Sequence, residues 1–241
     1  MKINPINCTN QYNKNDVSFN GGIPRKIVCF GPPASGKGTQ TSHLSKELGL
    51  PHVDMGSLLR STIASGSEEG QLAKSFIEKG QLVPTKIIAK IIENMLASSK
   101  CKDGYILDGF PRNLEQAHLL EGINQRIEAG KKAIFQAINF EVSPKLLLER
   151  IDNRRSCPQC GEIYNTKFKA PKIENECDIC HIPLRQRADD TAEIAQARFK
   201  TYDEQTAPLI NYYKEQGTLS SIDANGSIEE VWERLFSVIK H

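Results

Sequence analysis

The segment Gly31–Thr39, with the sequence Gly-Pro-Pro-Ala-Ser-Gly-Lys-Gly-Thr, constrains the fold of this chain more than any other. The continuous apolar run 27–30 that precedes it is typical of a buried parallel strand. Residues 40–48, which follow it, have the pattern of a helix that ends at Gly49. Because a strand, a glycine-rich turn and a helix in this order form the context of a phosphate-binding loop, the sequence predicts a parallel α/β sheet.

The residue types of this loop fit phosphate groups. Gly31 and Gly36 allow a sharp turn whose N–H groups point inward, and the following helix N-terminus favours an anion. Lys37 supplies a mobile cation for the outer phosphates, and Thr39 can place its hydroxyl on magnesium. Gly38 separates the lysine from the threonine, so the strict motif is missed by one position. The alternative is an ordinary glycine-rich turn with a surface lysine, and the flanking pattern favours phosphate binding.

Composition places the chain among ordinary globular proteins. A length of 241 residues predicts one large α/β domain with room for inserted lobes. The formal net charge is only +2, and the basic residues are dispersed, which argues against nucleic-acid and membrane partners. No apolar run approaches the roughly 18 residues that a membrane span requires.

The N-terminal segment and the cysteine content indicate the compartment. Residues 1–24 are polar and rich in Asn, and they lack both the apolar core of a secretory signal and the Arg of a transit peptide. We therefore expect a disordered extension. The odd number of cysteines, seven, fits a reducing cytoplasmic compartment better than a disulfide framework.

The segment 51–83 reads as a short strand followed by two short helices. The strand is predicted over 51–54, and the helices over 55–65 and 67–79. Because these two helices, bounded by glycines, are inserted where a doubly wound fold would run directly to its next helix, a small mobile lobe is expected. A stronger helix, with apolar residues at i, i+4 spacing, begins at Pro84-Thr85.

A second ligand-binding element is predicted around Asp108. This carboxylate ends the buried strand 105–108, and a loop with Arg112 leads from it to a helix that begins near Leu114. Open α/β sheets bind ligands at the carboxyl ends of their strands, so Asp108 could orient magnesium-bound water and Arg112 could grip a phosphate. The alternatives are a capping or turn carboxylate for Asp108 and a solvated surface charge for Arg112.

The next elements are a strand over 133–142 and a helix from Pro144. This helix is predicted to carry Arg150, Arg154 and Arg155 towards its end, where cations favour the helix dipole.

Two sequences further along have the spacing of capping boxes. Asp190-Thr-Ala-Glu193 predicts that Asp190 caps a long helix, which Pro208 then breaks or kinks. Ser227-Ile-Glu-Glu230 predicts the cap of the C-terminal helix, and the run 219–222 before it reads as a fifth strand.

Four cysteines form two Cys-x-x-Cys pairs. Cys157 and Cys160 are followed, after residues 161–176, by Cys177 and Cys180. The spacer is long enough to form a hairpin that brings both pairs around a tetrahedral ion, and four thiolates leave no open position, so the pattern predicts structural zinc. His181 is interpreted as a bystander. The alternative is four reduced or disulfide-paired thiols.

Together these motifs resemble the adenylate kinase family, in its long form with a zinc-bearing lid. The resemblance extends over residues 25–240, and the position of Gly38 is itself the family form. It rests on the following sequences: Gly-x-x-x-x-Gly-Lys-Gly-Thr at 31–39, Gly56-x-Leu-Leu-Arg60, Asp108-Gly-Phe-Pro-Arg112 with Gln116, Arg154-Arg155, the four cysteines, Asp189-Asp190, Arg198 and Thr206-Ala-Pro208.

The resemblance implies a fold and an activity. The fold is a doubly wound, five-stranded parallel sheet with a phosphate-binding loop, an AMP-binding lobe over 54–83 and a zinc-ribbon-like lid over 153–190. The core then comprises 25–53, 84–152 and 191–241. The activity is reversible, magnesium-dependent transfer of the terminal phosphoryl group from ATP to AMP, giving two ADP, by a monomeric cytoplasmic enzyme. Such a transfer needs positioning and charge stabilisation, which converging cations provide.

The family pattern also assigns site residues to positions of this chain. Those expected to act on the transferring group are Lys37, Arg112, Arg154, Arg187, Asp189 and Arg198. Those expected to hold ATP are Gly31, Ala34, Ser35, Gly36, Lys37, Gly38, Thr39, Arg150, Arg154, Ile163, Tyr164 and Gly226. Those expected to hold AMP are Met55, Arg60, Gln81, Leu82, Val83, Gly109, Phe110, Pro111, Arg112, Gln116, Arg187 and Arg198. Thr39 and Asp108 are expected to serve magnesium, and Cys157, Cys160, Cys177 and Cys180 to bind zinc.

Three positions depart from the family pattern. Ala34 replaces a glycine, which is tolerable if its φ is negative. Ser57 stands where Asp is usual, and Met55 stands where Thr is common near the acceptor base. Met55 can pack on the base but cannot donate the same hydrogen bond, so the choice of acceptor is open.

Three other functions compete with this reading. A GTP-dependent AMP kinase differs only in donor contacts that the sequence does not show. A UMP/CMP kinase is opposed by the full-length lid and by Gln116, which suits an adenine edge. A zinc-ribbon interaction protein that binds a nucleotide without turnover would not need the five converging arginines, namely Arg60, Arg112, Arg154, Arg187 and Arg198.

Overall fold

A five-stranded parallel sheet forms the centre of the protein. A computed structural model describes residues 25–127 and 135–240, so the expected N-terminal extension lies outside the described residues. The strands lie in the order β2-β3-β1-β4-β7, and all neighbours pair in parallel. Their bounds are Lys26–Phe30 for β1, His52–Asp54 for β2, Tyr105–Asp108 for β3, Gln136–Glu141 for β4 and Leu219–Asp223 for β7. The predicted fold class is therefore confirmed.

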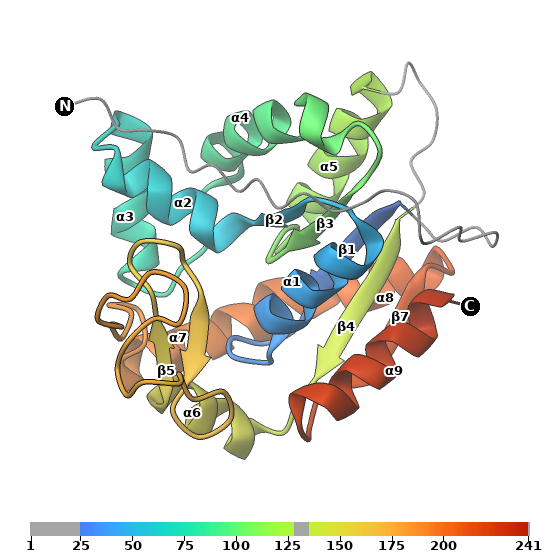
Figure 1. Cartoon of the computed structure of the whole chain (residues 1–241). Coiled ribbons are helices and arrows are strands. Elements are labelled where there is room, and N and C mark those ends of the chain that lie inside the picture. Colours follow the sequence, from blue (N-terminus) through green and yellow to red (C-terminus); the bar gives the residue numbers. More distant parts are fainter. Residues whose placement is uncertain (1–24, 128–134, 241) are drawn as a thin grey trace.

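Helices cover both faces of this sheet. On one face lie α1 (Lys37–Leu48) and α9 (Ile228–Lys240), and on the other α4 (Thr85–Leu96), α5 (Leu114–Ile127) and α8 (Pro208–Glu215). Figure 1 shows α1 and α9 in front of the sheet. Alternate residues of β1 point to opposite layers, since Ile27 joins the core under α1 and α9 while Val28 joins the core on the other side. The sequence predicted this burial on both faces, because the run 27–30 is apolar at every position and the helix that begins at Thr85 carries an apolar stripe. In α4, Ile88, Ile92 and Leu96 are buried.

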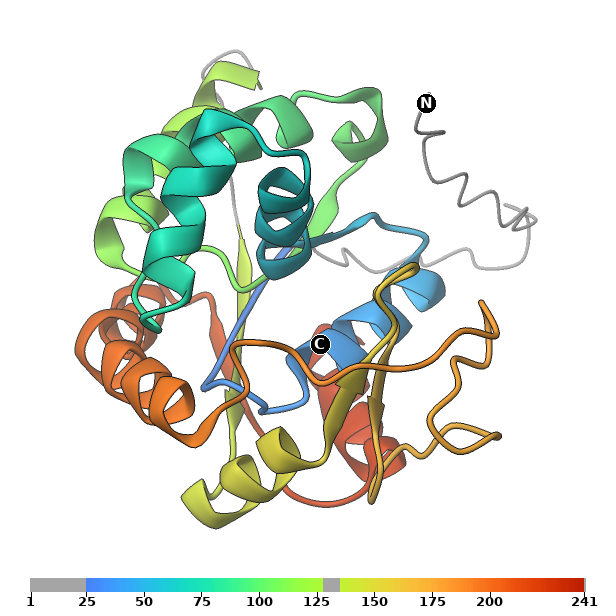
Figure 2. The same cartoon turned by 90° about the vertical axis from the view of Figure 1, so that its left-hand side faces the viewer.

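Two insertions project beyond the sheet on the same side (Figures 1 and 2). The first contains α2 (Met55–Ala64) and α3 (Glu68–Ile77), as the two-helix pattern predicted. The second, which we call the lid, follows α6 (Pro144–Asp152) and contains the antiparallel strands β5 (Arg154–Ser156) and β6 (Ile163–Asn165). The remaining elements are the 3₁₀ turn η1 (Ser99–Cys101), α7 (Ala192–Thr201) and the π-helical turn η2 (Tyr202–Thr206).

The end of α6 differs from the prediction. The helix ends at Asp152, and Arg150 alone of the three arginines lies in its last turn. Arg154 and Arg155 belong to β5, where they pair with Asn165 and Tyr164 of β6. Pairing with a second strand satisfies their backbone groups, so the helix does not continue.

The predicted cap at Asp190 is also wrong. Thr191 caps α7, and its side chain accepts a hydrogen bond from the Ile194 N–H. The Asp190 carboxylate instead forms a buried ion pair with Arg154 of the lid. A charge-assisted pair with a guanidinium binds a carboxylate more strongly than one backbone N–H does. The second predicted capping box is confirmed, because Ser227 and Glu230 exchange backbone and side-chain hydrogen bonds.

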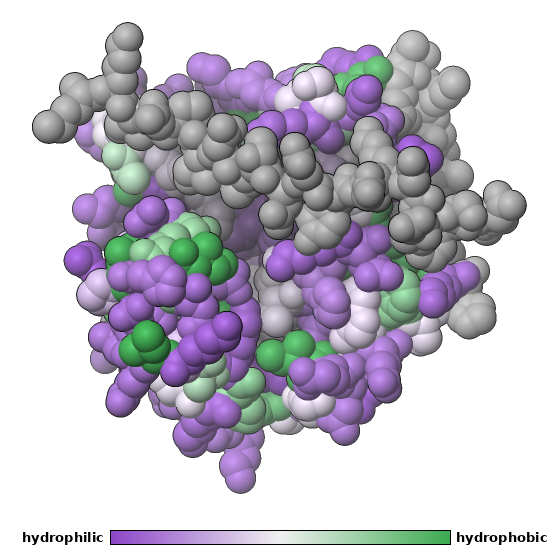
Figure 3. Space-filling model, in the orientation of Figure 1, coloured by the Kyte–Doolittle hydropathy of each residue, from purple (hydrophilic) through white to green (hydrophobic). Residues whose placement is uncertain are grey.

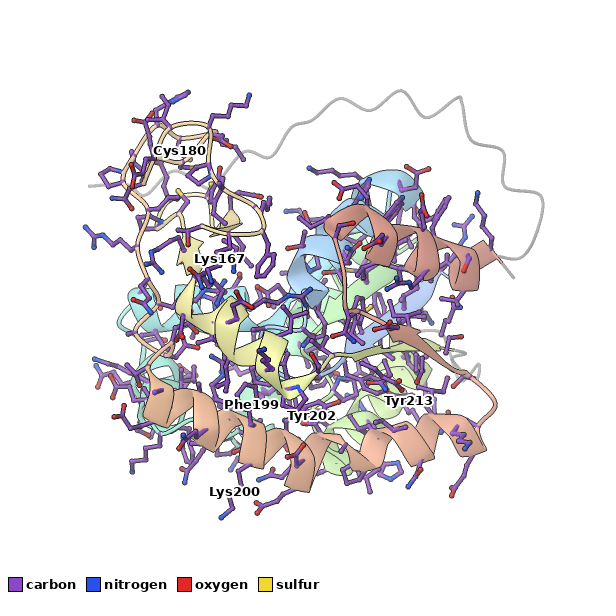
Figure 4. The ribbon with its side chains drawn as sticks, turned by 90° about the horizontal axis from the view of Figure 1, so that it is seen from below. Lys167, Cys180, Phe199, Lys200, Tyr202 and Tyr213 are labelled. Carbon is purple, nitrogen blue, oxygen red and sulfur yellow. The ribbon has the colours of Figure 1, made fainter. Side chains whose placement is uncertain are left out.

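The segment before Pro208 contains the predicted irregularity. The π-helical turn η2 ends just before this proline, which occupies the first turn of α8. Figure 4 shows α7, η2 and α8 as one long helical run, with Tyr202 on its inner side and Lys200 on its outer side. In the part of the chain described here, no helix has the length and apolar character needed to cross a membrane.

Candidate active site

The loop between β1 and α1 has the geometry of an anion cradle. Gly31 has φ 151° and approaches β4 so closely that a Cβ on it would lie 2.7 Å from the Phe140 carbonyl oxygen. Gly36, with φ 91°, is a left-handed residue at the start of α1. The Lys37 Nζ folds back over this loop and donates to the carbonyl oxygens of Gly31 (2.7 Å) and Pro32 (2.9 Å). Burial lowers the pKa of Lys37 to about 8, although the nearby Asp108 carboxylate opposes this change.

Ala34 adopts a left-handed conformation, with φ 63°. The condition under which an alanine would be tolerated here without strain, a negative φ, is therefore not met. An L-residue other than glycine pays roughly 1–2 kcal/mol for this conformation.

We expect Ala34→Gly to raise the free energy of unfolding by up to about 1 kcal/mol, because part of the gain is offset by the greater freedom of glycine in the unfolded chain. Chemical denaturation would measure this change. The matched control is Ala64→Gly in α2, which replaces an exposed helical alanine and should destabilise the protein. A loss of stability in both variants would contradict the prediction.

A cavity of about 500 Å³ opens beside this loop, between the core, the α2–α3 insertion and the lid. Figure 3 shows the surface hollowed between the lid and the core. Most of the expected site residues line it, namely Gly31, Ala34, Ser35, Gly36, Lys37, Gly38, Thr39, Arg60, Gln81, Leu82, Asp108, Gly109, Pro111, Arg112, Arg150, Arg154, Ile163, Tyr164, Arg187, Asp189, Arg198 and Gly226.

Four expected AMP-binding residues lie below this lining. Met55 (1 % exposed), Val83, Phe110 and Gln116 are buried, and none of them is among the described residues that line the cavity. Met55, which was expected near the acceptor base, packs in the apolar core with residues of α4 and α5. Gln116 bonds the Arg112 N–H through its Oε1 at 2.8 Å, and its Nε2 is buried without a hydrogen-bond partner.

Guanidinium groups from the lid and the core converge on this cavity. Arg154 is paired with Asp190, and the Arg198 Nη1 donates to an Asp189 carboxylate oxygen at 2.8 Å. Arg187 is the least compensated, because its Nε is buried without a partner. Burial and the neighbouring Arg154 lower the pKa of Arg187 to about 10. Because both partner aspartates are already paired, the cavity keeps a surplus of positive charge that suits a polyanion.

Asp108 supplies the negative charge beside the phosphate loop. Its Oδ2 lies 3.3 Å from the Thr41 hydroxyl and 3.5 Å from His52 Nε2. Burial, the largest effect, opposes ionisation, but the hydrogen bond and charge of His52 and the charges of Lys37 and Arg112 hold the pKa of Asp108 below its usual value. A carboxylate beside the Thr39-bearing end of α1 offers the oxygen ligands that magnesium prefers.

The four lid cysteines form a compact cluster. Their sulfur atoms all lie within 4.8 Å of one another, and His181 is not part of the group. Cys157 and Cys177 begin two similar turns, which end at left-handed residues, Gly161 (φ 76°) and His181 (φ 55°). Burial opposes the change, yet hydrogen bonds from the N–H groups of the Cys180 turn and from Tyr164 lower the pKa of Cys177 to about 6. A tetrathiolate set of this size fits zinc.

Comparison with known proteins identifies the family. A model of the family described as adenylate kinase matches residues 29–218. The chain belongs to the adenylate kinase family. An adenylate kinase of Methanosarcina acetivorans is 44% identical over 213 residues, which are 88% of this chain and 97% of that protein. Adenylate kinases of Clostridium kluyveri (39% over 214 residues, 89% and 97%) and Caldanaerobacter subterraneus (41% over 208 residues, 86% and 93%) are also similar.

Membership of the adenylate kinase family confirms the predicted enzyme class. The chain is a nucleoside monophosphate kinase, a phosphotransferase. The alternatives of a UMP/CMP kinase, a GTP-dependent kinase and a non-catalytic zinc-ribbon protein are not favoured.

Sequence reasoning missed a lid segment of this adenylate kinase. Lys167, Phe168 and Lys169 line the cavity, and the Arg150 guanidinium lies 6.0 Å from the Phe168 ring centroid. Figure 4 shows Lys167 at the end of the lid nearest the core. The signal was an aromatic residue between two lysines, which offers a stacking face and charge for a nucleotide.

Proposed function

We propose that this member of the adenylate kinase family transfers the terminal phosphoryl group of MgATP to AMP, giving two ADP, in the cavity between core and lid. The observation that carries the proposal is the convergence of Lys37 and six arginines on one cavity, where the Nε of Arg187 is buried without a hydrogen-bond partner. Phosphoryl transfer proceeds with charge spread over the equatorial oxygens, and preorganised cations stabilise that charge.

The donor occupies the phosphate-loop side in this proposal. The backbone N–H groups of residues 34–39 would hold the ATP phosphates, and Lys37 would exchange its present carbonyl partners for phosphate oxygens. Ile163, Tyr164 and Gly226, which line the cavity, would flank the adenine, together with Phe168, whose ring lies near Arg150.

The acceptor occupies the opposite side, against the α2–α3 insertion. Arg60 and Arg112 would bind the AMP phosphate, and the backbone of Gln81 and Leu82 would lie along the nucleoside of AMP. Gln116 is buried below the lining, so its unpartnered Nε2 would have to become exposed to the acceptor before it could read an adenine edge. We propose residues 54–83 as the AMP lobe and 153–190 as the lid, whose closure would exclude water as a competing acceptor.

The donor set around the phosphate loop fits magnesium. Thr39 and the ionised Asp108 would hold it with its water ligands. When bound with ATP it neutralises phosphate charge. We propose zinc in the cysteine cluster as a structural ion, because four free thiols lie together there. We also propose that the enzyme is cytoplasmic and monomeric.

The decisive experiment is a coupled assay of ADP formation with ATP or GTP as donor and AMP, CMP or UMP as acceptor. ATP with AMP should give the highest kcat/KM. A higher kcat/KM with GTP, CMP or UMP, or nucleotide binding without turnover, would contradict the proposal.

Met55→Thr tests the choice of acceptor. Because Met55 is buried away from the lining, the KM for AMP should change less than about tenfold, while stability falls by about 1–3 kcal/mol from lost apolar burial and a buried hydroxyl. Met95→Thr, in the partly buried face of α4, is the control and should also destabilise without changing the KM. A large change in the AMP KM without loss of stability would place Met55 in the site.

The pH profile should report Lys37. Since burial lowers the pKa of Lys37 to about 8, its charge is present below that pH, and kcat/KM for ATP should fall as the pH rises through this value. The kcat at saturating ATP should fall at a higher pH, because bound phosphates favour the charged lysine. A kcat/KM that stays constant through this range would rule out the assignment.

A further inference from the structure

The two cysteine turns of the lid differ at one sulfur atom. In each turn the N–H of the second cysteine lies 3.5 Å from the first sulfur, Cys160 to Cys157 and Cys180 to Cys177. Cys177 Sγ has an additional neighbour, the Tyr164 hydroxyl, at 3.6 Å. The sulfur of Cys177 is therefore held by a side chain as well as by its own turn.

The direction of this hydrogen bond follows from the second partner of the hydroxyl. The Asp178 N–H donates to the Tyr164 oxygen at 2.9 Å, so that oxygen already acts as an acceptor. A phenol has one proton, and Tyr164 (3 % exposed) and Cys177 (0 %) are both shielded from water. The O–H is left to donate to Cys177 Sγ, which makes it a charge-assisted donor when that sulfur is a thiolate.

The same side chain reaches the nucleotide cavity. Tyr164 is the central residue of β6 and pairs with Arg155 of β5 at the stem of the lid. It lines the cavity, and Lys169 Nζ lies 5.5 Å from its ring centroid. Figure 4 shows the cysteine end of the lid, marked by Cys180, farther from the core than Lys167. Tyr164 thus spans the lid from its stem to its cysteine cluster.

We propose that Tyr164 is a positioning residue for the lid's metal site, and that its hydroxyl holds the Cys177 thiolate in the orientation that coordinates the ion. This inference rests on the proposed four-cysteine site and not on the kinase reaction. Residues that hydrogen-bond a metal ligand orient it, and their loss typically lowers metal affinity about 10- to 100-fold.

The test compares full-length wild type with Tyr164→Phe, which removes only the hydroxyl. Each protein is stripped of metal, titrated with Co²⁺ while the thiolate-to-cobalt absorption is followed, and then titrated with competing Zn²⁺. We expect Tyr164→Phe to bind both ions about 10- to 100-fold more weakly and to shift the charge-transfer band. The matched control is Tyr105→Phe, whose hydroxyl donates to Asn124 in the core at 2.8 Å. It should lower stability and leave both affinities unchanged.

Tyr164→Leu separates the hydroxyl from the ring. It should weaken metal binding as much as Tyr164→Phe and additionally raise the KM for ATP, because it also removes the aromatic face. Metal affinity that falls only in Tyr164→Leu, or a Tyr164→Phe protein that binds Zn²⁺ like wild type, would overturn the proposal. A wild-type chain that binds neither ion would overturn it too. ADP formation by the same samples reports separately on the proposed function, which can fail while metal binding remains intact.

Discussion

Lys37→Met should reduce kcat by at least about 100-fold, which corresponds to roughly 3 kcal/mol of transition-state stabilisation, while the fold persists. Lys37 is the cation of the phosphate loop, and its Nζ is held on the carbonyl oxygens of Gly31 and Pro32 within the cavity lining. Methionine keeps the length of the side chain and removes its charge. Steady-state kinetics with ATP and AMP would measure the loss.

The experiment has to distinguish the loss of the Lys37 charge from a loss of stability. Burial already disfavours the Lys37 charge, so its removal should leave stability unchanged or slightly higher near neutral pH. Lys46→Met, at the exposed end of the same helix, is the matched control and should keep full activity. A kcat near that of wild type in Lys37→Met would show that the phosphate site lies elsewhere.

The elements around the phosphate loop were predictable because local pattern and tertiary structure agree there. The apolar run of β1, the left-handed glycines and the α1 pattern each specify the same strand, turn and helix. The position of Asp108 was equally predictable from the sequence, because it ends β3, whose apolar run is typical of a strand that is buried on both faces. Parallel strands then bring their carboxyl ends to one edge, where the cavity lies.

The failures occur where a distant partner overrides a local pattern. Asp190 has capping-box spacing, yet Arg154, far away in sequence, takes its carboxylate into a buried pair. Met55 stands at the position of the family's usual Thr, but α2 packs against the core so that Met55 is buried there and does not line the cavity. Sequence spacing shows which groups are near one another along the chain, whereas the positions of Asp190 and Met55 depend on contacts between segments that are distant in sequence.

The aspartates and arginines of the cavity have a common consequence for substrate binding. Arg154 and Arg198 are partly neutralised by Asp190 and Asp189 before any nucleotide arrives. Pairing reduces the cost of holding buried cations in the ligand-free protein, while Arg187 remains incompletely satisfied. A polyphosphate would therefore gain its largest new interactions from Arg187 and Lys37, and share Arg154 and Arg198 with the carboxylates.

Cys177→Ser should bind less than one equivalent of zinc tightly and melt at a lower temperature, yet retain kcat within about tenfold, or 1.4 kcal/mol, where the lid stays folded. Cys177 is fully buried and packs with Cys157, Tyr164 and Leu184 in the small apolar cluster of the lid. So few buried side chains cannot stabilise a lobe of this size alone, and the metal's binding free energy must appear as folding free energy of the lid. Thermal unfolding, metal analysis and ADP formation measure the three effects.

The outcome depends on what the cluster does for the lid arginines. Arg154 and Arg187 lie near the two stems of the lid, and Arg154 keeps its Asp190 partner whether or not the cysteines hold an ion. Partial loosening of the lid should therefore raise the KM for ATP before it lowers kcat. Cys101→Ser, a buried cysteine of the main core, is the matched control, and it should lower stability without changing zinc content. If wild type contains no zinc, or if Cys177→Ser keeps its melting temperature and loses kcat, the cysteines have another role. If the cysteines only stabilise the lid, and the cations near its stems act on the transferring group, then Cys177→Ser should lower the melting temperature before it lowers kcat.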